Sequence, residues 1–112
     1  MRVLIVEDDR DTAEALALLV RECGQETRVA NDALQALRTA AEWQPELVLL
    51  DIGLPEMDGY SLAARLRHEG LANARIVALS GYRPEDAGQS AASIDAYLLK
   101  PVRLQVLLDL LN

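Results

Sequence analysis

The chain has 112 residues, the size of one domain, which is enough to close a single hydrophobic core without disulfides. Its formal net charge is −7 and its lysines and arginines are scattered, so we expect no direct binding of nucleic acid. No apolar run approaches the length that crosses a bilayer, and no charged-then-apolar leader precedes the first apolar segment. We therefore expect one soluble, cytoplasmic domain over residues 1–112, without membrane contact.

Short apolar runs alternate with segments of helical spacing along the chain. Residues 2–6 are apolar and branched and end in three acids, which predicts a buried strand. Asp11 and Thr12 then offer a cap for a helix, and Gly24 supplies its stop. Residues 26–30 predict a second strand. The chain therefore begins as strand, helix, strand.

The alternation repeats in the middle of the chain. Asn31 predicts the cap of a second helix that carries Leu34, Leu37 and Ala41, and Pro45 breaks that helix. Residues 47–50 then form another apolar run, which Asp51 closes. This run predicts a third buried strand.

The last part of the chain continues the pattern with less regular helices. The remaining predicted elements are a helix over 60–68, a strand over 75–79, a weak helix over 84–92, a strand over 96–99 and a last helix over 102–111. The weak helix carries glycine and serines, which lower helix propensity. The last helix is apolar nearly all round.

Five strands that alternate with five helices predict a parallel sheet in an α/β three-layer sandwich. Right-handed crossovers place helices on both faces, so we expect every strand to be buried on both sides. Sites in such sheets form at the carboxyl ends of the strands. The polar residues that fall at those ends are Glu7, Asp8, Asp51, Ser80 and Lys100.

These residue types together suit phosphoryl chemistry. Three carboxylates at one sheet edge repel each other unless a cation neutralises them, and Mg²⁺ suits hard oxygen ligands. A carboxylate beside such an ion can attack phosphorus and form an acyl phosphate. Lys100 would then neutralise the transferred group, and the Ser80 hydroxyl would donate a hydrogen bond to it.

At these residues the chain resembles the response-regulator receiver family of two-component signalling, and the resemblance covers the whole chain. It implies a flavodoxin-like sheet with strand order 2-1-3-4-5. Asp51 opens the stretch Asp-Ile-Gly-Leu-Pro-x-Met-Asp-Gly, so the resemblance makes it the phosphoacceptor, with the Gly53 carbonyl as a metal ligand. It makes Glu7 and Asp8 the acidic pair, in which Asp8 binds Mg²⁺ directly and Glu7 acts mainly through water. Asp9, the next acid, is a candidate modulator.

The resemblance also implies a set of switch residues. Ser80 matches the switch Ser or Thr, and Tyr97 matches the switch aromatic. Lys100 and Pro101 match a Lys-Pro pair whose peptide bond is typically cis in the family. Tyr82 is a further candidate modulator of the site.

The function that this resemblance implies is a phosphoacceptor domain rather than a dedicated enzyme, although it would allow self-dephosphorylation. The donor would be the phosphohistidine of a histidine kinase or of a histidine phosphotransfer protein. Phosphorylation would switch a surface made by the segments 84–94, 96–99 and 102–111, for a protein partner or a homodimer. The segment from Ser80 to Lys100 is shorter than the family norm, so we expect its helix to be short or irregular.

Other readings of the same residues remain open. Glu7, Asp8 and Asp9 alone could be a solvated, helix-capping charge run, and Tyr97 could be a plain core aromatic. A receiver-like docking module that has lost phosphorylation is the main alternative function. A phosphatase of the haloacid-dehalogenase type also uses an aspartate nucleophile, but it needs a second Asp where this chain has Gly53.

Overall fold

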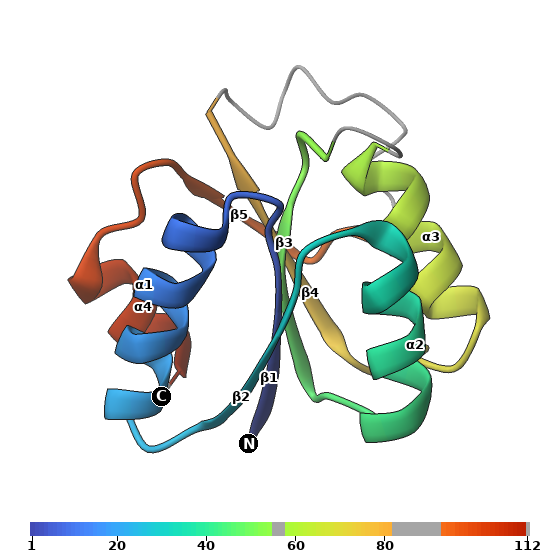
Figure 1. The fold of residues 1–112 in the computed structure, drawn as a ribbon, viewed down its shortest axis with the longest axis horizontal. Coiled ribbons are helices and arrows are strands. Elements are labelled where there is room, and N and C mark those ends of the chain that lie inside the picture. The colour runs from blue at the N-terminus through green and yellow to red at the C-terminus, as the bar shows by residue number, and fades with distance from the viewer. Residues whose placement is uncertain (55–57, 82–92, 112) are drawn as a thin grey trace.

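The computed structural model describes residues 1–54, 58–81 and 93–111 (Figure 1). The elements, in chain order, are β1 (Arg2–Val6), α1 (Arg10–Glu22), β2 (Glu26–Ala30), α2 (Ala33–Trp43), β3 (Leu47–Asp51), α3 (Gly59–His68), β4 (Arg75–Ser80), β5 (Ala96–Leu99) and α4 (Leu104–Leu111). The weak helix predicted over 84–92 and the residue Tyr82 lie outside the described residues. Helix α4 is therefore the last of the five predicted helices.

The sheet has five strands in the order β2-β1-β3-β4-β5, and every neighbouring pair is parallel. This order confirms the flavodoxin-like prediction. The predicted strands agree with the observed ones to within one residue. Since all strands run the same way, their carboxyl ends share one edge of the sheet, at the top of Figure 1.

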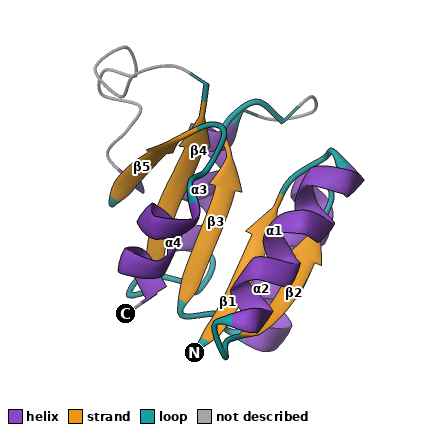
Figure 2. Cartoon of the chain, turned by 90° about the vertical axis from the view of Figure 1, so that its left-hand side faces the viewer, coloured by secondary structure: helices purple, strands orange, loops and turns teal. Residues whose placement is uncertain are grey.

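Helices α1 and α4 cover one face of the sheet, and α2 and α3 cover the other (Figures 1 and 2). Each face has its own apolar cluster. Ile5 and Leu49 pack with α1 and α4, whereas Leu4 and Leu50 pack with α2 and α3. Alternate residues of one strand thus serve opposite layers, which is the three-layer sandwich that the sequence predicts. No helix in the described ranges is long and apolar enough to span a membrane.

The prediction that every strand is buried on both sides is wrong for the two edge strands. β3 is buried at every position, but β2 alternates between exposed and half-buried residues and β5 is only partly buried. The reason is position: β2 and β5 each have a neighbour on one side only, so helices and strands cover them less completely.

Two predicted helix caps are also wrong. Asp9, not Asp11 or Thr12, caps α1, since its side chain accepts hydrogen bonds from the backbone N–H groups of those two residues. Asp32, not Asn31, caps α2. Helix α2 buries Ala33, Ala36 and Ala40 and leaves Leu34 57% exposed.

Arg67 near the end of α3 connects several segments at the amino end of the sheet. Its guanidinium donates to the carbonyl of Ser93, to the Asp95 carboxylate at 2.5 Å and to the carbonyl of Ala74. The Asp95 carboxylate also accepts the N–H of Ile76 at 2.8 Å. These contacts join α3, the start of β4 and the residues before β5 into one network, which we call the Arg67 network.

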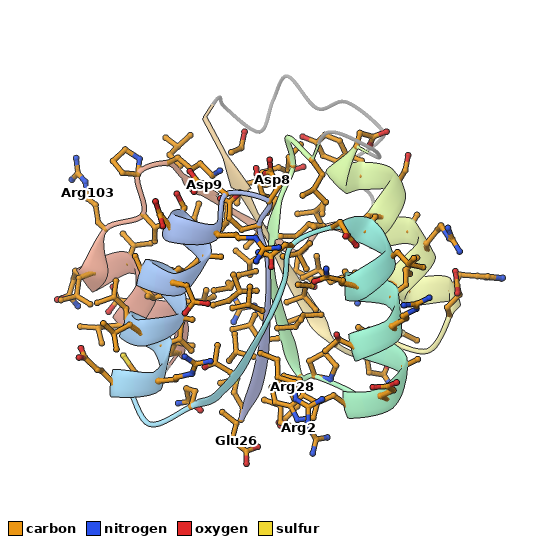
Figure 3. The ribbon with its side chains drawn as sticks, in the orientation of Figure 1. Arg2, Asp8, Asp9, Glu26, Arg28 and Arg103 are labelled. Carbon is orange, nitrogen blue, oxygen red and sulfur yellow. The ribbon has the colours of Figure 1, made fainter. Side chains whose placement is uncertain are left out.

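The same end of the molecule holds Trp43, the single tryptophan of the chain. Its ring packs beside the core layer of α2 and α3, and the Arg28 guanidinium carbon lies 4.9 Å from the ring centroid. Figure 3 places Arg2 and Arg28 at this end, opposite Asp8 and Asp9. A cation over an indole face is a favourable contact that also shields edge strand β2.

Candidate functional site

Three carboxylates meet at the carboxyl ends of β1 and β3. Glu7, Asp8 and Asp51 each offer an oxygen within 4.8 Å of the others. Glu7 is 2% exposed and Asp51 is 7% exposed, whereas Asp8 faces solvent. Figure 3 shows Asp8 and Asp9 at this edge of the sheet. The structure therefore brings together the acids that the sequence placed at separate strand ends.

Lys100 completes the cluster from the end of β5. Its ammonium nitrogen lies 3.0 Å from Glu7 Oε1 and 3.2 Å from Asp51 Oδ1. Its backbone N–H donates to the Ser80 carbonyl at 2.8 Å, and Ser80 itself is buried at the end of β4. One cation thus bridges two buried carboxylates, which offsets part of the repulsion between them.

The loop after β3 approaches Asp51 closely. The Gly53 N–H donates to Asp51 Oδ1 at 3.0 Å. Gly59, the first residue of α3, donates its N–H to the Ile52 carbonyl at 3.0 Å, and a Cβ at Gly59 would lie 2.6 Å from the Ile52 Cα. This contact requires a glycine, because both atoms belong to backbone that cannot swing away. It holds the start of α3 directly against the residue that follows Asp51.

The pKa values of the two buried acids, Glu7 and Asp51, shift in opposite directions. Burial, with the neighbouring Asp51 carboxylate, raises the pKa of Glu7 to about 7, although Lys100 opposes this. Burial also acts to raise the pKa of Asp51, but hydrogen bonds from Glu7 and the Gly53 N–H, with the Lys100 charge, hold it below its usual value. Burial acts to lower the pKa of Lys100, yet its two carboxylate partners raise it. Of the two buried acids, Asp51 therefore loses its proton more readily than Glu7.

The donor set of this cluster fits Mg²⁺. All its side-chain ligands are carboxylate oxygens, which hard divalent cations prefer, and solvent-exposed Asp8 leaves one side open for water or phosphate oxygens. These observations agree with the Mg²⁺ prediction.

The remaining predicted site residues lie around this cluster. The Lys100–Pro101 peptide bond is cis. Tyr97 in β5 is half-buried, and within the described part of the chain its buried hydroxyl has no hydrogen-bond partner. Asp9 is the cap of α1, so the capping alternative applies to this acid.

Comparison with known proteins agrees with this geometry. Residues 3–112 match the family model described as response regulator receiver domain. The chain belongs to the response-regulator receiver family. It is 37% identical over 102 residues to the transcriptional regulatory protein PrrA of Mycobacterium leprae, and the match covers 89% of this receiver and 43% of PrrA. The receiver thus spans less than half the length of that relative.

Two further likenesses involve proteins closer to this receiver in length. An uncharacterised 14.6 kDa protein of Leptolyngbya boryana is 34% identical over 105 residues, which is 91% of the receiver and 80% of that protein. The response regulator protein TrrA from Thermotoga maritima, solved in complex with Mg²⁺-BeF, superposes with a TM-score of 0.88 at 27% identity, covering 98% of the receiver and 95% of TrrA.

Two apolar hollows border the receiver's acidic cluster. One, of about 630 Å³, lies between α1 and the segment that follows β5, and it is lined by Asp11, Thr12, Ala15, Leu16, Leu19, Leu79, Lys100, Pro101 and Val102. The other, of about 510 Å³, lies between β5 and α4, where Leu99, Leu104 and Val106 are exposed. Both reach Lys100, so both adjoin the site.

One residue of the site was missed by the sequence reasoning. The side-chain amide of Asn31 donates to the Glu7 carbonyl at 3.0 Å. Asn31 and Asp32 are equally good capping residues, and the sequence alone does not show which one caps and which one is left for another partner. An Asn directly after a strand, beside a second capping residue, is the signal that could have suggested it.

Proposed function

We propose that this receiver accepts a phosphoryl group on Asp51 from the phosphohistidine of a histidine kinase or a histidine phosphotransfer protein, and that phosphorylation switches a protein-binding surface. The proposal rests on one observation above the others. A buried, ionised Asp51 lies in contact with Lys100 and within a cluster of three carboxylates at the open edge of the sheet.

In this proposal Mg²⁺ is held by Asp8, Asp51 and the Gly53 carbonyl, with Glu7 acting mainly through water. When bound, the ion would neutralise the charge on the phosphoryl oxygens during transfer. Exposed Asp8 and exposed Gly53 support this assignment, because both lie on the solvent side of the cluster where a donor would arrive.

The transfer itself needs only an exchange of bonds to phosphorus. An Asp51 carboxylate oxygen forms the new P–O bond while the P–N bond to the donor imidazole breaks, and the imidazole keeps the electron pair and later takes a proton from water. Lys100 lies 3.2 Å from Asp51 Oδ1, so its ammonium can pair with the incoming phosphoryl oxygens. The Ser80 hydroxyl would donate to another of them.

The donor would dock over the larger apolar hollow, between α1 and the residues after β5. This hollow reaches Lys100, and its walls are apolar side chains such as Leu16 and Leu19. A helix of the donor with apolar residues on one face would fill such a groove and present its phosphohistidine to the acidic cluster.

The output surface in this proposal lies around β5 and α4. Leu99, Leu104 and Val106 are exposed there, beside the smaller hollow that Tyr97 helps to line. Movement of Ser80 toward the phosphoryl group would let the Tyr97 side chain turn inward. This change would reshape the surface for a protein partner or a second copy of the chain.

Intact mass measured with and without acetyl phosphate and Mg²⁺ tests the proposal. The wild-type protein should gain one base-labile phosphoryl group, and Asp51→Asn should gain none while keeping the native fold. Asp58→Asn is a matched control, because Asp58 is an exposed helix cap seven residues along the chain and should not affect uptake. No uptake by the wild type in the presence of Mg²⁺ would favour the phosphorylation-independent docking module.

A further inference from the structure

Asn31 connects the β2–α2 turn to the acidic cluster. The Asn31 side-chain Nδ2 donates to the Glu7 carbonyl at 3.0 Å, and the preceding residue, Ala30, accepts the Glu7 N–H at 3.0 Å. Both backbone groups of Glu7 are therefore held by two successive residues at the end of β2. Beyond Val6, β1 has ended, so these two bonds guide the chain as it leaves the sheet.

The cap of α2 is complete without the Asn31 side chain. Asp32 accepts the Gln35 N–H at 2.8 Å, and Gln35 Oε1 accepts the Asn31 backbone N–H at 3.0 Å. The backbone of Asn31 is thus fixed by the cap, while its side-chain amide points to another segment. The Asn31 side-chain amide therefore fixes the Glu7 backbone and does not contribute to the helix cap.

The bond to Glu7 also orients Asp8. The Glu7 carbonyl belongs to the planar peptide that joins Glu7 to Asp8, so a donor that holds its oxygen fixes the whole plane and the direction of the next Cα. Within the described ranges, the Asp8 carboxylate has no hydrogen-bond or ion-pair partner and is exposed. Its position therefore depends on the backbone rather than on side-chain contacts.

We propose that Asn31 is a positioning residue for the Mg²⁺ site, acting through the Glu7–Asp8 peptide. The inference rests on the proposed function, since it assumes that Asp8 is a metal ligand. Asn31 touches neither the ion nor the phosphoryl group. It sets the angle at which Asp8 is presented, as residues outside the ligand shell do in other metal sites.

Two variants separate this role from a structural one. Asn31→Ala removes the donor to Glu7, and calorimetric titration with Mg²⁺ alone should show affinity about tenfold weaker, in line with losses at other outer-shell positions. Asp32→Ala removes the helix cap and leaves the Asn31 amide in place. It should lower the urea midpoint of unfolding but keep Mg²⁺ affinity within about twofold of wild type.

A rescue experiment adds a second readout. Acetyl phosphate uptake by Asn31→Ala should be slower than wild type at limiting Mg²⁺ and should recover at saturating Mg²⁺, because the acceptor Asp51 is untouched. If Asn31→Ala does not fold, Asn31→Leu, which has nearly the same shape without a donor, takes its place with the same expected loss of affinity.

The outcomes that overturn the inference are distinct from those that overturn the proposed function. Unchanged Mg²⁺ affinity in the Asn31 variants, or an equal loss in Asp32→Ala, would make Asn31 a structural residue only. Absence of Mg²⁺ binding by the wild-type protein would instead remove the metal site from the proposed function itself.

Discussion

Lys100 lies slightly closer to Glu7 than to Asp51, with its Nζ 3.0 Å from Glu7 Oε1 and 3.2 Å from Asp51 Oδ1. In this arrangement the lysine acts as the counter-ion of the acidic cluster. A divalent ion at the same edge would take over that neutralisation and free the ammonium for phosphoryl oxygens. The stability of the protein and its metal binding should therefore be linked through Lys100.

Lys100→Met should lower the free energy of unfolding by about 1 to 3 kcal/mol in the absence of Mg²⁺, because it leaves two buried carboxylates without their cation. The partial exposure of Lys100 keeps this below the cost of breaking a fully buried pair. Saturating Mg²⁺ should shrink the deficit, which urea unfolding with and without the ion would show. Arg65→Met, which breaks the exposed Arg65–Glu69 pair, should have a small effect that Mg²⁺ leaves unchanged. A deficit in Lys100→Met that is independent of Mg²⁺ would contradict the link.

Gly59→Ala should destabilise the protein by about 1 to 3 kcal/mol, even though alanine favours helices. The added Cβ would meet the Ile52 Cα at 2.6 Å and the Asp51 carbonyl oxygen at 3.2 Å, so the start of α3 must move. Urea denaturation would measure the loss. Gly81→Ala is the matched control, since no atom of the described residues lies within 4 Å of its Cβ position. Equal stability of the two variants would show that α3 can shift freely.

Ser80→Ala should uncouple phosphorylation from the response while leaving phosphoryl uptake largely intact. In the proposed function the hydroxyl donates to the phosphoryl group, so its loss should reduce the bias toward the active state by about 1 to 3 kcal/mol. Hydrogen exchange around β5 and α4, with and without beryllofluoride, would detect this. A response of the variant equal to that of wild type would assign the switch to another residue.

Asp95→Asn should destabilise the protein by about 1 to 2 kcal/mol at neutral pH, because it weakens the Arg67 network. Burial acts to raise the pKa of Asp95, but the Ile76 N–H and the Arg67 guanidinium outweigh it and hold the pKa below the ordinary 3.8. The stability that this carboxylate contributes is therefore present above 3.8 and is lost as the pH falls through the lower folded-state value. Urea unfolding at decreasing pH should show wild type and variant converging.

The Arg67→Ala background provides the control for this pH dependence. In a double-mutant cycle, Asp95→Asn should cost less once Arg67 is gone, because the two side chains share one ion pair. Additive costs would mean that Asp95 acts through the Ile76 N–H alone.

Local sequence pattern predicted the strands and the acids at their ends, because each apolar run and each polar residue that closes it are neighbours in the chain. The contact between Lys100 and Glu7 joins residues that are 93 positions apart, so no local signal reports it. Lys100 and Glu7 each follow a strand of one parallel sheet, so the sequence predicts that both lie at the same edge of the sheet. Which acid the Lys100 ammonium contacts there depends on side-chain packing.

The errors arose where neighbouring residues had equal local preferences. Asp9 and Asp11 can both cap a helix, and so can Asn31 and Asp32, so the tertiary structure decides which one does. Successive side chains of a helix point about 100° apart, since a turn takes 3.6 residues. Ala33 and Leu34 therefore lie on different faces of α2, and packing against the sheet buries Ala33 while Leu34 stays 57% exposed.

The position of Trp43 has a practical consequence for spectroscopy. It is the single tryptophan of the chain, and it packs beside Arg28 at the end of the sheet opposite the acidic cluster. Its fluorescence should therefore change when the protein unfolds and stay nearly constant when Mg²⁺ or a phosphoryl group arrives. A denaturation curve followed by this emission would measure stability undisturbed by ligand quenching, and ligand binding would need calorimetry or an introduced fluorophore near Asp8.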